Sequence, residues 1–308
     1  MTGARAALAL ALVVAAGPAH GAGGPLSIVT TTTDLRALVE AVGGDRVAVE
    51  SLAPPQHDPH AIEVKPGQLA RLRGAALLVR VGLDHEPWLA RALATLAEPA
   101  LAPGGPRDLD LSRSVTLVQV ETPRLRDDRA TPHQHGFGNP HYWLDPENAR
   151  PMTAAIAEAL GRLVPAERAG FDEHRRRFLA RLDAGLARWR AALAPFRGAR
   201  VVAVHDTWPY FAARFGLTIA ATVEPTPGVP PSPASLGALV ERMRATGVRV
   251  LVAEPYASAA LVRGIAERSG ARAVTLVPSV GADAEAGDYV ALFDVDVTRL
   301  AGALAAAR

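Results

Sequence analysis

The chain has 308 residues, of which 49% are hydrophobic, a formal net charge of +2 and no cysteine. This length and apolar content are sufficient for one or two globular domains, while the nearly neutral charge without a long basic block excludes nucleic acid as an expected partner. The lack of cysteine excludes disulfides, thiolate metal ligands and a lipid attached to a cysteine.

The first 22 residues have the features of a secretory signal peptide. Arg5 supplies a positive charge, residues 6–17 form an apolar run, and residues 19–22 provide small side chains for cleavage. The apolar run of about twelve residues is too short to cross a bilayer, which needs roughly 20 residues. We therefore expect a signal peptide cleaved near residues 21–22 and a soluble protein in the periplasm.

The first part of the mature chain alternates between strands and helices. We expect strands at residues 26–31, 46–52 and 76–81, helices at 34–42, 66–73 and 87–96, and a possible strand at 114–120. Residues 146–163 and 166–193 have helical periodicity, and the second run contains no proline. A helix of about 28 residues would be ~42 Å long, which exceeds one small lobe, so we expect it to be a rigid connector.

The alternation then returns in the last third of the chain. We expect strands at 201–204, 217–223, 248–253 and 273–277, and helices at 208–215, 235–246, 257–269 and 289–306. This order predicts an α/β fold with two lobes, each a mainly parallel sheet covered by helices. The expected division is a signal peptide at 1–22, an N-terminal lobe at 23–165, a connecting helix at 166–194 and a C-terminal lobe at 195–308.

Three histidines stand at points in the chain where an α/β fold usually binds ligands. His60 lies in the loop after the strand at 46–52, His205 directly follows the strand at 201–204, and His141 lies in the segment FGNPHYWLDPENAR. Ligands of open α/β sheets bind beyond the carboxyl ends of the strands. Three imidazoles can bind zinc and leave one position for a carboxylate or water. The alternative is that these are three unrelated loop histidines.

The local sequence around His141 indicates that its side chain is held in place. Pro140 precedes it and two aromatic residues follow it. Asp145 and Pro146 then have the pattern of an N-cap and a first helical residue. A histidine on a stiff loop that leads into a capped helix suits a ligand better than a mobile surface residue.

Four segments, taken together, resemble a known family of transport proteins. They are GGDRVAVESLAPPQHDPHAIEVKPGQLARLRGAALLVRVGLDHEPWL, GNPHYWLDPENA, VVAVHDTWPYFAARFGL and VLVAEPYASAALVRGIAERSGA. In this order they are similar to the zinc/manganese solute-binding proteins of metal-importing ABC transporters, over nearly the whole mature chain. The resemblance implies two Rossmann-like lobes, a long connecting helix with limited hinge motion, and a metal site in the cleft between the lobes. It also implies a non-enzymatic, monomeric periplasmic protein that delivers the ion to a cognate ABC permease in the inner membrane.

The resemblance extends to individual metal ligands. His60 and His141 match the two ligands of the family's N-terminal lobe, and His205 matches a third that is His in zinc-binding members and Glu in manganese-binding members. The resemblance therefore favours Zn²⁺ as the transported ion over Mn²⁺, consistent with the preference of Zn²⁺ for imidazole. The family's fourth ligand is often an Asp, but this chain has Pro278-Ser279-Val280-Gly281 at that place. Glu254 is our first candidate for the fourth ligand, with Glu224 or water as alternatives.

His133 and His135, in the segment TPHQHGFG, resemble a reduced form of the His-rich loop that some zinc-binding members carry. Such a loop could capture zinc weakly and pass it inward, or the two side chains could simply be solvated.

The remaining polar residues near these motifs have simpler expectations. We expect His57 and His85 at the surface and His174 as a solvated residue of the connecting helix. Asp58 and Asp206, each next to a candidate ligand, could accept hydrogen bonds that orient the imidazoles.

Three other functions fit parts of the pattern. A periplasmic zinc buffer or chaperone without a permease, or a manganese-binding homologue, would have the same fold. A zinc hydrolase could also use three histidines and a nearby Glu. The hydrolase is disfavoured because the chain has neither an HExxH motif nor a nucleophile elbow.

Overall fold

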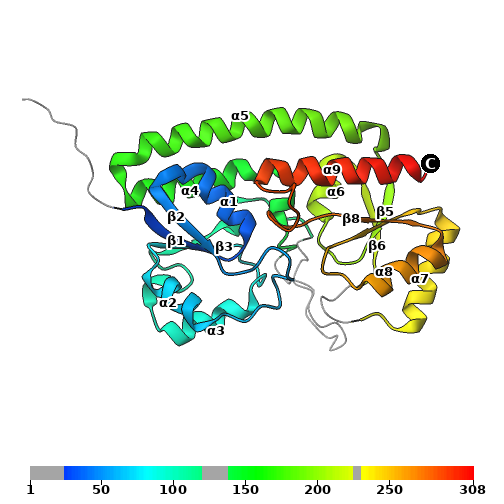
Figure 1. Cartoon of the computed structure of the whole chain (residues 1–308), viewed down its shortest axis with the longest axis horizontal. Coiled ribbons are helices and arrows are strands. Elements are labelled where there is room, and N and C mark those ends of the chain that lie inside the picture. The colour runs from blue at the N-terminus through cyan, green and yellow to red at the C-terminus, as the bar shows by residue number, and fades with distance from the viewer. Residues whose placement is uncertain (1–23, 120–137, 225–229) are drawn as a thin grey trace, which may run out of the picture.

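The computed structural model describes residues 24–119, 138–224 and 230–308. The predicted signal peptide and the pair His133 and His135 lie outside these ranges. The described residues form two α/β lobes, each with a four-stranded parallel sheet, so the predicted fold class is confirmed (Figure 1). The exact division of the chain into a leader, two lobes and a connector stays a prediction.

The N-terminal lobe has the strand order β2-β1-β3-β4. Its strands are β1 (Leu26–Thr30), β2 (Val47–Ser51), β3 (Leu77–Arg80) and β4 (Asp108–Asp110). Its helices are α1 (Thr33–Gly43), α2 (Pro66–Gly74), α3 (Pro87–Leu96) and α4 (Ala149–Leu163). A 3₁₀ turn, η5 (Pro146–Asn148), leads into α4, and Asp145 caps it by accepting a hydrogen bond from the main-chain N–H of Glu147, as the sequence predicts.

The C-terminal lobe has the strand order β6-β5-β7-β8. Its strands are β5 (Arg200–Ala203), β6 (Thr218–Thr222), β7 (Val250–Ala253) and β8 (Arg272–Thr275). Its helices are α6 (Pro209–Phe215), α7 (Pro233–Thr246), α8 (Ala259–Ser269) and α9 (Tyr289–Ala306).

The region after α3 differs from the prediction. The possible strand at 114–120 is wrong where the structure describes it, because residues 111–114 form a 3₁₀ turn, η3 (Leu111–Ser114), and residues 115–119 are irregular. The last parallel strand of this lobe is instead the three-residue β4. It pairs with β3, and its two aspartates bind Arg80 at 2.7 and 3.0 Å, so these ion pairs help to hold a strand that has a single apolar residue, Leu109.

Helix α5 (Arg168–Leu193) runs along the backs of both lobes (Figure 1). It packs against α1 and α4 on one side and against α9 on the other. Its buried residues include Phe171, Leu186 and Trp189, and they belong to one hydrophobic cluster that extends into both sheets. The two lobes therefore share a continuous core along this helix.

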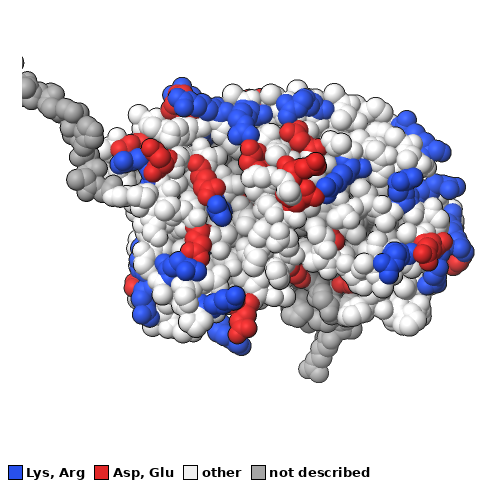
Figure 2. Space-filling view, in the orientation of Figure 1, with Lys and Arg blue, Asp and Glu red and all other residues white. Residues whose placement is uncertain are grey.

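The face of the protein shown in Figure 2 carries both acidic and basic side chains, and basic side chains gather over α5. Several of these arginines are paired with acids of neighbouring elements, for example Arg181 with Asp288 and Arg188 with Asp294 of α9. Within the described ranges, no helix is both long and apolar enough to span a membrane.

Candidate metal site

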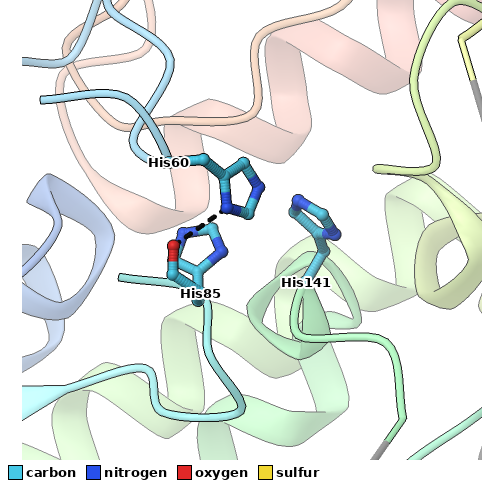
Figure 3. Close-up of side chains that lie close together, drawn as sticks. All are labelled: His60, His85 and His141. Atoms are coloured by element: carbon cyan, nitrogen blue, oxygen red, sulfur yellow. Dashed lines mark hydrogen bonds between the residues drawn. The ribbon is translucent and has the colours of Figure 1, made fainter. Parts of the chain in front are cut away.

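Three histidine side chains of the N-terminal lobe converge on one point (Figure 3). His60 follows β2, His85 follows β3, and His141 precedes α4. Their potential ligand nitrogens all lie within 4.8 Å of one another. The ring centroids of His60 and His85 are 4.3 Å apart, and that of His141 lies 5.5 and 5.4 Å from these two. We call these three residues the histidine cluster.

The ring of His60 is oriented by a main-chain contact. Its Nδ1 lies 2.9 Å from the carbonyl oxygen of His85, and a carbonyl can only accept, so Nδ1 carries the proton (Figure 3). The Nε2 atom of a neutral ring then presents its lone pair. Burial lowers the pKa of His60, and the charge of His205 adds to this, although Asp58 and the bond to His85 act in the opposite direction. The neutral, metal-binding form of His60 is therefore favoured.

His141 is oriented in the same manner by Asn139. Its Nδ1 lies 3.0 Å from Asn139 Oδ1, which also accepts from the main-chain N–H of His141 at 2.9 Å. The amide nitrogen of Asn139 donates to the carbonyl and carboxylate oxygens of Asp206, at 2.9 and 3.2 Å. An amide that donates to these acceptors must present its oxygen to His141, so Nδ1 of a neutral His141 carries the proton and Nε2 is its unprotonated nitrogen.

His85 is fully buried, and the expectation that it lies at the surface is wrong. The turn before it is unusual, because Gly82, Leu83 and Asp84 all have positive φ angles of 80°, 55° and 57°. Left-handed conformations cost non-glycine residues roughly 1–2 kcal/mol each, and such strain gathers at functional sites. At Gly82 a Cβ would come within 2.4 Å of Asp110 Oδ1. The backbone is thus held in a demanding turn that points His85 inward.

The carboxylate of Glu86 holds this turn. It accepts from the main-chain N–H groups of Val81 and Gly82, at 2.7 and 3.1 Å, and from the hydroxyl of Thr31. Burial raises the pKa of Glu86 to about 7, and these three hydrogen bonds act in the opposite direction. This buried acid, the N-cap residue of α3, is stabilised by the main-chain donors that the turn exposes.

In the C-terminal lobe, His205 lies between two carboxylates. It follows β5, and Glu224 and Glu254 follow the neighbouring strands β6 and β7. His205 Nδ1 is 2.7 Å from Glu254 Oε2, and Nε2 is 3.1 Å from Glu224 Oε2. Burial lowers the pKa of His205, but the hydrogen bonds and charges of Glu254 and Glu224 outweigh burial and leave it raised. Glu254 Oε1 accepts a further hydrogen bond from Trp208 Nε1 at 2.8 Å.

The two groups of residues meet at the junction between the lobes. Asn139 bridges from the histidine cluster to Asp206, the neighbour of His205. Trp143 packs against His85 and His141, with ring centroids 5.0 and 5.4 Å apart, and donates to the carbonyl of Pro278. The junction is therefore polar around the histidines and closed on one side by Trp143.

The other residues singled out in the sequence have separate roles. Asp58 accepts from the main-chain N–H of His60, and Asp206 accepts from Asn139, so each supports a histidine-bearing segment. His57 is exposed, as predicted. The expectation for His174 is wrong, because this residue is half-buried and its Nδ1 lies 3.1 Å from the carbonyl of Val42.

The histidine cluster has the right donors for a divalent ion but a looser spacing than a bound ion requires. Zn–N bonds of 2.0–2.1 Å in a tetrahedron place the ligand nitrogens about 3.4 Å apart. The three nitrogens here lie within 4.8 Å of one another. A modest rotation of the side chains of His60 and His141, which lie on loops, would close the difference.

A protein with two α/β lobes, parallel sheets in both, and a histidine cluster at their junction has the architecture of a metal-binding transport receptor. The chain belongs to the ZnuA family, described as zinc-uptake complex component A, periplasmic, whose family model matches residues 28–303. The resemblance inferred from the sequence is thereby confirmed. The family consists of solute-binding components of transporters and not of enzymes, which removes the hydrolase alternative.

Two relatives show how far the similarity extends. The high-affinity zinc uptake system protein ZnuA of Paracoccus denitrificans is 30% identical, over 92% of this chain and 93% of the relative. The protein of the same name from Yersinia pestis is 26% identical, over 82% of each chain. The likeness therefore covers most of both chains.

Solved structures agree with this assignment. A crystal structure of ZnuA superposes with a TM-score of 0.72 at 25% identity, covering 91% of this chain and 99% of the other. The solute-binding protein FpvC of Pseudomonas aeruginosa, in complex with Ni²⁺, gives 0.77 at 26% identity, covering 92% and 98%. Its complex with Mn²⁺ gives 0.76 at 27%, covering 92% and 99%. Proteins of this fold thus bind different divalent metals, and the ion must be argued from the donors present.

Proposed function

We propose that this protein is the zinc-binding component of an ABC importer, which takes up Zn²⁺ in the periplasm and delivers it as a monomer to a permease in the inner membrane. The observation that supports this most is the convergence of the histidine cluster, in which His60 and His141 each present Nε2 to a common point. Imidazole nitrogen suits Zn²⁺, whereas Mn²⁺ prefers carboxylate and water oxygens. The names of the relatives from Paracoccus denitrificans and Yersinia pestis point to the same ion.

For the loaded state we propose that His60, His141 and His205 contribute ligands across the junction. Both oxygens of Glu254 are engaged, one by the ring of His205 and one by Trp208. This arrangement suits a carboxylate that orients a ligating imidazole, as in other zinc sites, better than a direct ligand. Glu224 contacts Nε2 of His205, so it would have to give way for that nitrogen to reach the ion.

The test of the function has two parts. Purified protein, freed of metal and then offered Zn²⁺ and Mn²⁺ together, should retain Zn²⁺, as measured by elemental analysis after gel filtration. Equal occupancy by Mn²⁺ would contradict the zinc assignment. Membrane vesicles that contain the cognate permease and ATPase should then accumulate zinc only when the loaded protein is added. Binding without such accumulation would instead indicate a periplasmic buffer.

The affinity for zinc should fall as the pH falls, because ligating imidazoles must be neutral. Because the pKa of His205 is raised, its ring becomes protonated at a pH above the usual imidazole pKa of about 6.5. The positive charge of the protonated ring then repels the metal ion. The lowered pKa of His60 delays its own protonation to more acidic solution. Chelator competition between about pH 8 and 5 should show a decline that is steepest below about pH 6. An affinity that stays flat to pH 5 would contradict a histidine site.

A further inference from the structure

We propose that His85 is a direct metal ligand, so that His60, His85 and His141 of the N-terminal lobe receive a divalent ion before His205 joins them. This inference rests on the proposed metal-binding function and specifies its ligands. It gives the fully buried His85 a direct role in binding the ion.

The first argument is geometric. Three imidazoles from three separate segments of one lobe have their potential ligand nitrogens within 4.8 Å of one another. Figure 3 shows the rings around a common point, with that of His85 beside that of His60 and that of His141 opposite them. Three histidines leave one position of a tetrahedral zinc site for a further ligand, which His205 can supply.

The second argument is the preparation of the ligands. The Nδ1 atoms of His60 and His141 lie against oxygen acceptors, so Nδ1 carries the proton and Nε2 is the unprotonated nitrogen of each neutral ring. The acceptor for His60 is the main-chain carbonyl of His85 itself. The segment that carries His85 thus also orients the ring of His60, so the positions of these two side chains depend on each other.

The third argument is the backbone before His85. The consecutive positive φ angles at Leu83 and Asp84 are costly for residues with a side chain, and the neighbouring carboxylate of Glu86 ties the turn to β3. A surface histidine would not need such a turn. The strain instead accounts for a side chain that must point inward at a fixed place.

His205 is differently placed in this structure. Both of its ring nitrogens are within hydrogen-bond distance of carboxylates of its own lobe, Glu254 and Glu224. To bind the ion it must first give up at least one of these contacts. The N-terminal lobe therefore has the set of donors that can receive the ion first, and His205 can join afterwards.

The decisive experiment measures how many histidine side chains bind zinc in a variant that lacks His205. X-ray absorption of zinc-loaded His205→Gln protein should show three histidine ligands if His85 binds the ion. Two histidine ligands would overturn the proposal, because only His60 and His141 would then remain.

Affinities measured by competition with a chromophoric chelator give a second test. His85→Gln should weaken zinc binding by at least about 100-fold, the upper range for residues that merely support a ligand. His205→Gln should weaken it by less than His85→Gln does, and His57→Gln, a change at an exposed histidine in the same loop as His60, should have no effect. Unchanged affinity in His85→Gln, or a larger loss in His205→Gln, would overturn the proposal.

The outcomes separate this inference from the function on which it rests. A wild-type protein that binds no zinc would remove the proposed function and the inference together. A wild-type protein that binds zinc while His85→Gln binds equally well would remove the inference alone. If His85→Gln does not fold, the histidine count in His205→Gln protein still decides the question.

Discussion

Replacement of His141 by alanine is expected to weaken zinc binding by at least about 100-fold, since even partners that only orient a ligand contribute 10–100-fold. The ring of His141 is one side of the histidine cluster, 5.4–5.5 Å from the other two rings. Its loss removes a donor and also frees Asn139, which otherwise connects the ligand to Asp206 of the other lobe. Competition titration with a chelator of known affinity would measure the change.

The matched control for this change is His57→Ala. His57 is an exposed histidine three residues before His60, so its removal alters the same loop without removing a ligand. We expect its zinc affinity to stay within about twofold of the wild type, because exposed side chains distant from a site contribute little. A His141→Ala protein that binds zinc as tightly as this control would show that the histidine cluster is not the metal site.

Replacement of Trp189 by alanine is expected to lower the free energy of unfolding by about 3–5 kcal/mol, the usual cost of removing a large buried aromatic side chain. Trp189 lies on α5 with 2% of its surface exposed. Its ring packs on Phe293 of α9 with centroids 5.1 Å apart, and its Nε1 donates to Asp294 at 2.7 Å. Chemical denaturation of the metal-free protein would measure the loss.

The control for Trp189 is its neighbour Arg188. Arg188 pairs with the same Asp294, but its side chain is 57% exposed, so Arg188→Ala should cost less than about 1 kcal/mol. Zinc affinity of the folded Trp189→Ala protein should remain near that of the wild type, because the tryptophan is remote from the histidine cluster. A loss of stability below about 1 kcal/mol in Trp189→Ala would contradict the role assigned to α5.

Much of the fold could be predicted because periodicity and local breakers determine most element bounds. Helices α3 and α9 begin and end at the residues expected from sequence, at Pro87 and Leu96 and at Tyr289 and Ala306. Strand β4 could not be predicted, because its three residues, Asp108–Asp110, are too few to give a recognisable period and two of them are charged. Its pairing depends on β3 and on Arg80, which the sequence places 28 residues away. Contacts of this kind are tertiary and leave no local pattern.

The residues of the candidate site could be predicted only in part, for a similar reason. His60, His141 and His205 stand out because each follows a strand or precedes a capped helix. His85 follows β3 in the same sense, so the rule that ligands gather at the carboxyl ends of strands could have found it. Its neighbours Asp84 and Glu86 are acidic, and charged residues on both sides of a histidine are typical of a solvated loop. In the structure Glu86 points inward and accepts hydrogen bonds from main-chain N–H groups of the turn that precedes His85. The same turn directs the side chain of His85 into the interior.

The continuous core along α5 limits how much the protein can change its conformation when it binds a metal ion. One hydrophobic cluster includes Leu38 and Leu160 from the N-terminal lobe, Leu186 of α5, and Val201 and Phe293 from the C-terminal lobe. A wide separation of the lobes would expose part of this cluster to water, at a free-energy cost of about 25 cal/mol per Å² of apolar surface. Movement is cheaper in the loops that carry the histidines. We therefore expect the metal-bound and metal-free proteins to have nearly the same overall shape. A membrane partner would then distinguish them by the conformation of those loops.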